Sequence, residues 1–103
     1  MTADQQKFGL YLTVLRFLAY KVTNNLQQIY LDIDLPAHKM LLTAYYLNDP
    51  SELELELLDD LETDSNAHIP DMFVEKSVVK LVENYKEGEK HDFTVFAVFV
   101  PYE

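Results

Sequence analysis

The sequence contains no cysteine, which excludes disulfide bonds, thiolate metal sites and cysteine nucleophiles. It has only two glycines, Gly9 and Gly88, so it has no glycine-rich phosphate-binding loop. The longest apolar stretch, Phe8–Ala19, is interrupted by polar residues and is too short to span a bilayer. The first residues lack the basic and then apolar layout of a signal peptide. These absences predict a cytoplasmic protein.

Positive charge is also scarce, because 8 Lys and Arg stand against 18 Asp and Glu, for a net charge of −10. Residues 1–48 carry a net charge of +1 and residues 49–103 a net charge of −11. Nine acids lie in one stretch without Lys or Arg: Asp49, Glu52, Glu54, Glu56, Asp59, Asp60, Glu62, Asp64 and Asp71. Such a field attracts a basic partner and repels nucleic acid and anionic membranes. The alternative interpretation is a solvated helix face that only keeps the protein soluble.

The first predicted element is a helix over about residues 3–23. Thr2 and Gln5 fit a capping box at its start, and Thr23-Asn24-Asn25 is typical of a helix end. Apolar residues at helical spacing predict its buried side: Phe8, Tyr11, Leu12, Leu15, Leu18, Ala19 and Val22, widened by Leu10, Val14 and Phe17. We therefore expect this helix to be heavily covered.

A hairpin follows, with strands predicted at Gln28–Asp34 and Lys39–Leu47. In the first strand Ile29, Leu31 and Ile33 alternate with polar residues and Tyr30, which indicates one buried face. The second strand is rich in apolar and aromatic residues on both faces.

Ser51 and Glu54 repeat the capping-box pattern and predict a second helix. Its leucines fall on one arc, opposite four acids: Glu52, Glu56, Asp59 and Asp60. The alternation over residues 53–57 would also suit a strand, but the caps and the Leu and Glu propensities favour the helix.

Residues 72–82 fit either a strand or a helical stripe, and their four valines favour the strand. Phe93–Val100 is a strand with apolar residues on both faces, expected in the middle of a sheet or under a covering partner. The predicted fold is α+β, a single domain over residues 1–103 with the order α-β-β-α-β-β. Its four-stranded antiparallel sheet would carry two helices packed on one face.

Several strings along the chain, in their order and spacing, carry a resemblance: Val22–Leu26 at the helix end, the serine and glutamates of Ser51–Glu56, then Leu61–Asp64 and Ala67–Pro70. They are similar to segments of small bacterial immunity proteins, which are encoded beside contact-dependent growth inhibition toxins and other polymorphic toxins. The chain departs from that family at Val100–Tyr102, where an arginine-bearing strand end is expected. The resemblance implies one-to-one inhibition of a cognate toxin domain, commonly a nuclease, without catalysis.

Nucleases bind a polyanion through Lys and Arg, so their basic clefts attract an acidic protein. We expect the partner to meet the acidic side of the second helix, the turn after it, and aromatic anchors on the hairpin. The predicted partner-binding residues are Glu52, Glu56, Asp59, Asp60, Asp64, Asp71, Tyr30, Tyr45 and Tyr46. For the tyrosines, ordinary packing is the alternative interpretation. Nucleic acid and membranes are not expected partners.

No pattern indicates catalysis, a cofactor or a metal. Residues 60–71 have the length of a calcium loop, but Ser65 stands where its sharp turn needs glycine. Asp32 and Asp34 share one strand face, which is usually just solvated. The histidines lie apart and lack the spacing of metal ligands: His38, His68 and His91. We expect a protein that is not an enzyme.

Two other classes of function stay open. A DNA mimic of the anti-restriction or anti-CRISPR type would use acidity against a DNA-binding enzyme, but such mimics usually spread their charge over the surface. A generic interaction or dimerisation module would offer the apolar last strand for pairing. A toxin reading frame immediately upstream would favour immunity, and a phage operon would favour mimicry.

Overall fold

The computed structural model describes residues 2–19, 21–69, 73–84 and 90–97. The described elements are, in chain order, α1 (Ala3–Arg16), β1 (Leu26–Asp34), β2 (Lys39–Tyr46), α2 (Glu52–Asn66), β3 (Val74–Leu81), a 3-10 turn (Val82–Asn84) and β4 (Phe93–Ala97). The α+β class is confirmed, as are the helix starts after Thr2 and Ser51, the hairpin and a strand within residues 72–82. The last three residues of the predicted strand Phe93–Val100 lie outside the described residues.

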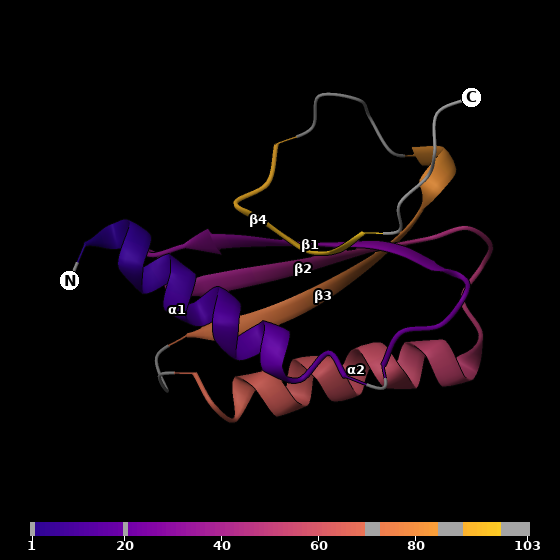
Figure 1. Cartoon of the computed structure of the whole chain (residues 1–103), viewed down its shortest axis with the longest axis horizontal. Coiled ribbons are helices and arrows are strands. Elements are labelled where there is room, and N and C mark those ends of the chain that lie inside the picture. Colours follow the sequence, from indigo (N-terminus) through magenta and orange to yellow (C-terminus); the bar gives the residue numbers. More distant parts are fainter. Residues whose placement is uncertain (1, 20, 70–72, 85–89, 98–103) are drawn as a thin grey trace.

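The four described strands form one mixed sheet in the order β3-β2-β1-β4 (Figure 1). β1 pairs antiparallel with β2 and with β4, whereas β2 and β3 are parallel. The prediction of a wholly antiparallel sheet is therefore wrong. α2 returns the chain to the end of the sheet where β2 began, and strands joined by such a helical crossover run parallel.

β4 lies at one end of the described sheet, beside β1, and not in its middle. Its apolar residues on both faces predicted a strand either in the middle of a sheet or under a covering partner, and the first of these alternatives is wrong. Phe93 instead stacks on Tyr11 of α1, with ring centroids 4.6 Å apart, and Val95 is buried in the core. Contact with α1 thus replaces part of the cover that flanking strands would give.

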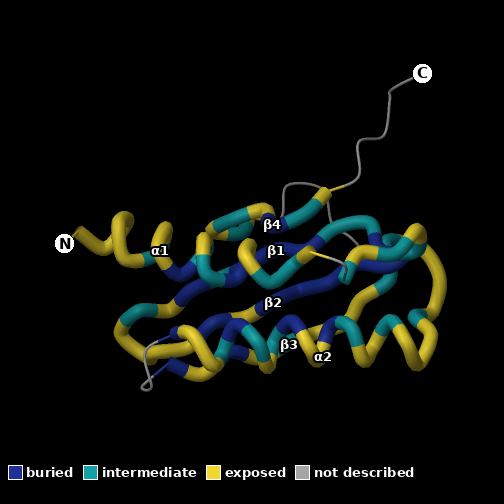
Figure 2. Tube along the Cα trace, turned by 60° about the horizontal axis from the view of Figure 1, so that its bottom comes forward, coloured by how far each residue is buried: buried dark blue, intermediate teal, exposed yellow. Residues whose placement is uncertain are grey.

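The core lies between the sheet and the two helices, which both pack on the same face of the sheet. Its central residues come from the alternating positions of β1 and β2, and Figure 2 shows these strands as the most buried part of the chain. α1 contributes Leu10 and Val14, and α2 contributes Leu58 and Leu61. The predicted core positions Ile29, Leu31 and Ile33 of β1 are confirmed, but Tyr30 on the opposite face of the strand is buried as well.

α1 ends at Arg16, about two turns before the predicted end. The described residues 17–19 and 21–25 instead lead from α1 to β1 along α2, where Lys21 pairs with Asp64 near the end of the helix. Thr23 Oγ1 donates a 2.5 Å hydrogen bond to Glu54 Oε2, and Asn25 Nδ2 donates one of 3.3 Å to Glu54 Oε1. Asn25 also bonds Asn48 through both its side-chain oxygen and nitrogen. These long-range hydrogen bonds tie the residues before β1 to the start of α2 and keep them in a non-helical conformation.

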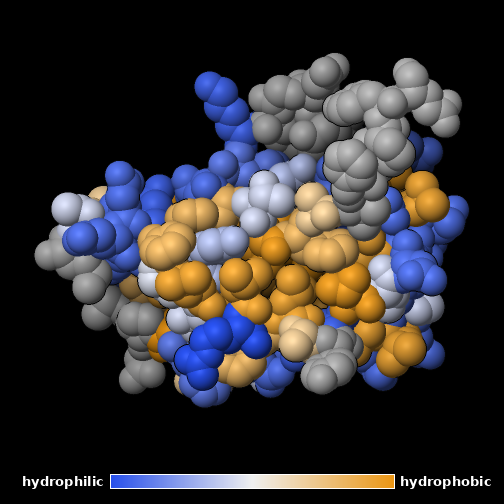
Figure 3. Space-filling view, viewed as in Figure 1, coloured by the Kyte–Doolittle hydropathy of each residue, from blue (hydrophilic) through white to orange (hydrophobic). Residues whose placement is uncertain are grey.

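The side of α1 that faces the core also differs from the prediction. Leu10 and Val14 are buried, whereas Phe8, Leu12 and Leu15 are exposed. Figure 3 shows apolar atoms gathered over α1 and the adjoining part of the molecule. The helix is apolar around much of its circumference, so the packing of the sheet, and not the periodicity alone, decides which side is covered.

Candidate functional site

α2 presents four carboxylates on its outer side. Glu52, Glu56, Asp59 and Asp60 are all exposed, while Leu58 and Leu61 face the core. Among the described residues, none of these four acids has an ion pair or a hydrogen bond through its side chain. The helix itself contains no Lys or Arg. The predicted acidic face is therefore present on a rigid, capped helix, and we call these four residues the acidic face.

The capping residue Glu54 locks the start of this helix to the rest of the fold. Ser51 N donates to Glu54 Oε1 at 3.1 Å, in addition to the bonds from Thr23 and Asn25. Burial alone would raise the pKa of Glu54, but the hydrogen bonds from Thr23, Ser51 and Asn25 outweigh it and lower the pKa. Its carboxylate is thus held charged, away from the acidic face.

We expect Glu54→Gln to lower the free energy of unfolding at pH 7 by about 1 kcal/mol, because an amide nitrogen then faces hydrogen-bond donors. A carboxyl with a lowered folded pKa stabilises the fold above its unfolded pKa and loses this contribution as pH falls through the folded pKa. The difference from wild type should therefore shrink towards pH 3 in urea unfolding. Glu56→Gln, at an exposed position, is the control and should change little. If Glu54→Gln lowered the free energy of unfolding equally at pH 7 and pH 3, the lowered pKa of Glu54 would be contradicted.

The remaining predicted partner-binding residues that the structure describes do not join the acidic face. Asp64 is paired with Lys21 through Nζ and Oδ2 at 3.1 Å, and Asp71 lies outside the described residues. Tyr30, Tyr45 and Tyr46 have exposed fractions of 9%, 0% and 3%. Tyr46 belongs to the core cluster, and burial followed by the charge of Glu54 raises its pKa to about 12. The alternative interpretation of these tyrosines as packing residues fits their burial, so we leave them out of the proposed interface.

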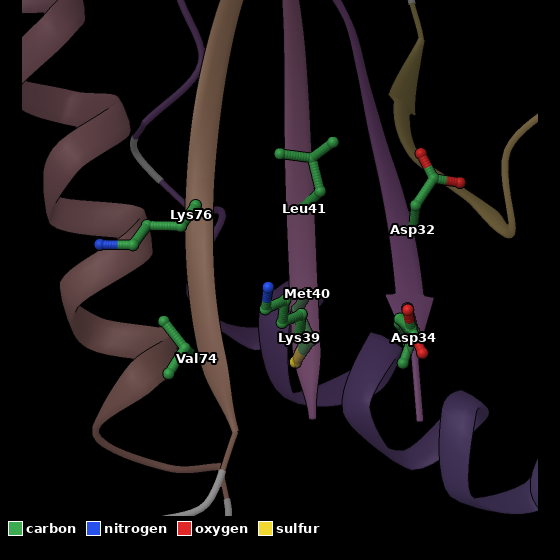
Figure 4. A pocket seen from close by; sticks show the side chains of 8 residues that line it. Asp32, Asp34, Lys39, Met40, Leu41, Val74 and Lys76 are labelled. Carbon is green, nitrogen blue, oxygen red and sulfur yellow. The ribbon is translucent and has the colours of Figure 1, made fainter. Parts of the chain in front are cut away.

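A groove of about 490 Å³ lies across β1, β2 and β3, and the sequence did not indicate it. Figure 4 shows Asp32 and Asp34 on β1 along one side of it, and Leu41 of β2 between the strands that border it. Lys39 and Lys76 also line it. The residues come from three strands brought together by the parallel pairing of β2 and β3, which sequence reasoning missed.

Asp32 is engaged in holding the chain before β4. Its Oδ2 lies 2.7 Å from His91 Nδ1, and its Oδ1 accepts a 3.0 Å hydrogen bond from Asp92 N. The His91 ring stacks on Tyr30 with centroids 4.3 Å apart. Asp92 in turn accepts from Ile33 N at 2.7 Å. These contacts give Asp32 a positioning role in the fold, because it joins β1 to the chain before β4.

Glu75 of β3 is a buried acid beneath α2, with an exposed fraction of 1%. Its Oε2 lies 2.6 Å from Ser65 Oγ, and Ser65 Oγ also lies 2.6 Å from the carbonyl oxygen of Leu61. Burial raises the pKa of Glu75 to about 7; the bond from Ser65 acts against this shift and the nearby charge of Glu62 adds to it.

The hydrogen-bond geometry agrees with a proton on Glu75. The Ser65 hydroxyl has one hydrogen for two acceptors, and the Leu61 carbonyl carries none. If the Ser65 hydrogen goes to Leu61, a protonated Glu75 can donate its own hydrogen to Ser65 Oγ. An ionised Glu75 would leave one of these contacts without a hydrogen, and its Oε1 has no hydrogen-bond partner among the described residues.

Neither a metal site nor a membrane span is found in the described part of the chain. No group of three or more His, Cys, Asp or Glu side chains there is arranged to hold a metal ion. None of the helices described is both long enough and apolar enough to cross a membrane.

No protein-family model matches this sequence, and a search of curated proteins finds no match. The resemblance to immunity proteins therefore stays a prediction that rests on the strings of the sequence alone.

Proposed function

We propose that this protein is an immunity protein that binds a cognate toxin domain one to one and blocks it without catalysis. The acidic face of α2 would contact a basic surface on the toxin, such as the cleft of a nuclease. The observation that carries the proposal is the set of four exposed carboxylates without an ion pair among the described residues: Glu52, Glu56, Asp59 and Asp60.

The physical argument concerns the rate of association and the absence of ion pairs that binding would have to break. Exposed charges of one sign on a rigid element raise the rate at which an oppositely charged protein is captured. No Lys or Arg of the described chain pairs with the acidic face. The Lys and Arg side chains of a toxin could therefore bind these carboxylates without first breaking ion pairs within this protein. Rapid capture is what a cell needs against an incoming toxin.

The first test is co-expression of this protein with a toxin domain encoded next to its gene. The proposal expects that growth is restored and that the two proteins co-purify in a one-to-one complex. Failure to bind or protect against any neighbouring toxin would contradict it. A phage operon in place of a toxin gene would favour the DNA-mimic alternative.

The second test addresses the acidic face directly. Glu56→Lys combined with Asp60→Lys should slow association with the toxin about tenfold at low salt, because steering is lost. The loss should shrink at high salt, where charges are screened. Glu83→Lys, at an exposed position outside α2, is the control and should change the rate far less. Association rates are measured by stopped flow. Equal rates for the double variant and wild type would show that the acidic face does not steer association.

A further inference from the structure

A row of four residues on α1 runs along its exposed side at a spacing of four: Asp4, Phe8, Leu12 and Arg16. Residues four apart form a continuous ridge on a helix surface. All four are exposed, and Phe8 and Leu12 have exposed fractions of 51% and 42%. Leu15 widens the apolar part of this ridge. We call the four residues Asp4, Phe8, Leu12 and Arg16 the α1 ridge.

The ridge has opposite charges at its two ends. Asp4 lies in the first turn and Arg16 in the last, and neither has an ion pair among the described residues. Arg16 only lies over the ring of Phe17, 5.6 Å from its centroid. The helix dipole favours this order of charges, but it gives no reason for two large apolar side chains between them to remain in water.

This order makes the ridge complementary to itself. Around a two-fold axis between Phe8 and Leu12, a second α1 would run antiparallel to the first. Phe8 would then face Leu12 of the other copy, and Asp4 would face Arg16 of the other copy. In a two-fold contact each such pair occurs twice, and ridges formed by residues four apart pack against each other at a preferred crossing angle.

We propose that the α1 ridge is a homodimer interface, in which two copies of this chain pack α1 against α1 antiparallel. Net charge supports this choice of surface. Two chains of −10 each repel, and residues 49–103 hold a net charge of −11, whereas residues 1–48 hold +1. The α1 ridge holds one acid, Asp4, and one base, Arg16, so it adds no net charge of its own to a contact between two copies. The proposal goes beyond the toxin-binding function and does not depend on it.

The first experiment measures the mass of the purified full chain by sedimentation equilibrium over a range of concentrations. Wild type is expected to show a reversible monomer–dimer equilibrium. Leu12→Glu should shift it to monomer, because it places a charge in the middle of the apolar contact. Leu55→Glu is the matched control, since Leu55 lies on α2 with an exposed fraction of 43%, and it should leave the dimer intact. A monomeric wild type, or equal effects of the two variants, would overturn the proposal.

The second experiment exchanges the charges of the ridge. Asp4→Arg or Arg16→Asp alone should weaken dimerisation about tenfold, because each removes two ion pairs and sets like charges opposite each other. The double variant should restore dimerisation, although it opposes the helix dipole. Circular dichroism of each variant separates a loss of helix from a loss of dimer. A folded double variant that dimerises no better than the single variants would refute the antiparallel pairing.

Discussion

Glu75→Gln is expected to raise the free energy of unfolding at pH 8 by about 1–3 kcal/mol, and to change it little at pH 4. The glutamine amide can donate to Ser65 Oγ as a protonated carboxyl does, without placing a charge in the core. Wild type carries the cost of ionising Glu75 at pH 8, because its pKa in the fold is about 7.

The sign of the pH dependence of stability follows from the raised pKa of Glu75 in the fold. Below the ordinary pKa of a glutamate, Glu75 is protonated in both the folded and the unfolded chain and contributes no difference. As pH rises from there to about 7, the unfolded chain loses its proton first, and the stability of the folded chain falls. Above about 7 both states are ionised and the loss remains constant.

Urea unfolding of wild type and Glu75→Gln at pH 4, 6 and 8 would measure the effect. Glu83→Gln is the control, because Glu83 is exposed, and its difference from wild type should not change with pH in this way. A Glu75→Gln variant that is less stable than wild type at pH 8 would show that the buried carboxylate is stabilised by its surroundings, contrary to this account.

The second large effect is expected at Leu42 on β2, which is fully buried among the core residues of the sheet and both helices. Leu42→Ala should lower the free energy of unfolding by about 3 kcal/mol, since it removes buried apolar surface and leaves a cavity. The loss is comparable to a large part of the total stability of a small domain.

Leu41 is the matched control, because it is the neighbouring leucine of the same strand and points to the groove with an exposed fraction of 38%. Leu41→Ala should cost less than about 1 kcal/mol. Chemical denaturation of both variants measures the difference. Similar losses at the two positions would mean that Leu41 is covered in the folded protein.

Local signals in the sequence were sufficient for the starts of elements. The capping boxes at Thr2 and Ser51 each join a side chain to a backbone donor three residues away, so they need no tertiary contact to form. The alternation of Ile29, Leu31 and Ile33 predicted a strand with one buried face for the same reason.

The end of α1 and its covered side were predicted wrongly because they depend on distant residues. The bonds of Thr23 and Asn25 to Glu54 join positions about thirty residues apart. α1 is apolar on several sides, so its periodicity could not distinguish Leu10 and Val14 from Phe8 and Leu12.

For the candidate site, the sequence predicted that the acids of α2 share one exposed side, since helical spacing alone sets their direction. It could not show that Asp64 pairs with Lys21, which depends on how α2 packs beside the segment after α1, or that Tyr45 is fully buried, which depends on contacts such as the one with Tyr30 of β1. The groove and the buried pair of Ser65 and Glu75 were missed for the same reason. Their residues come from separate elements and follow no local pattern.

The sequence by itself determined the helix caps, the alternating strand and the placement of negative charge, because each depends on spacing within a few residues. The tertiary structure alone decided the parallel pairing of β2 with β3, the side of α1 left in water and the burial of Glu75. These features depend on contacts between segments that are far apart in the sequence. The free energy of packing them together cannot be read from the pattern of any one segment.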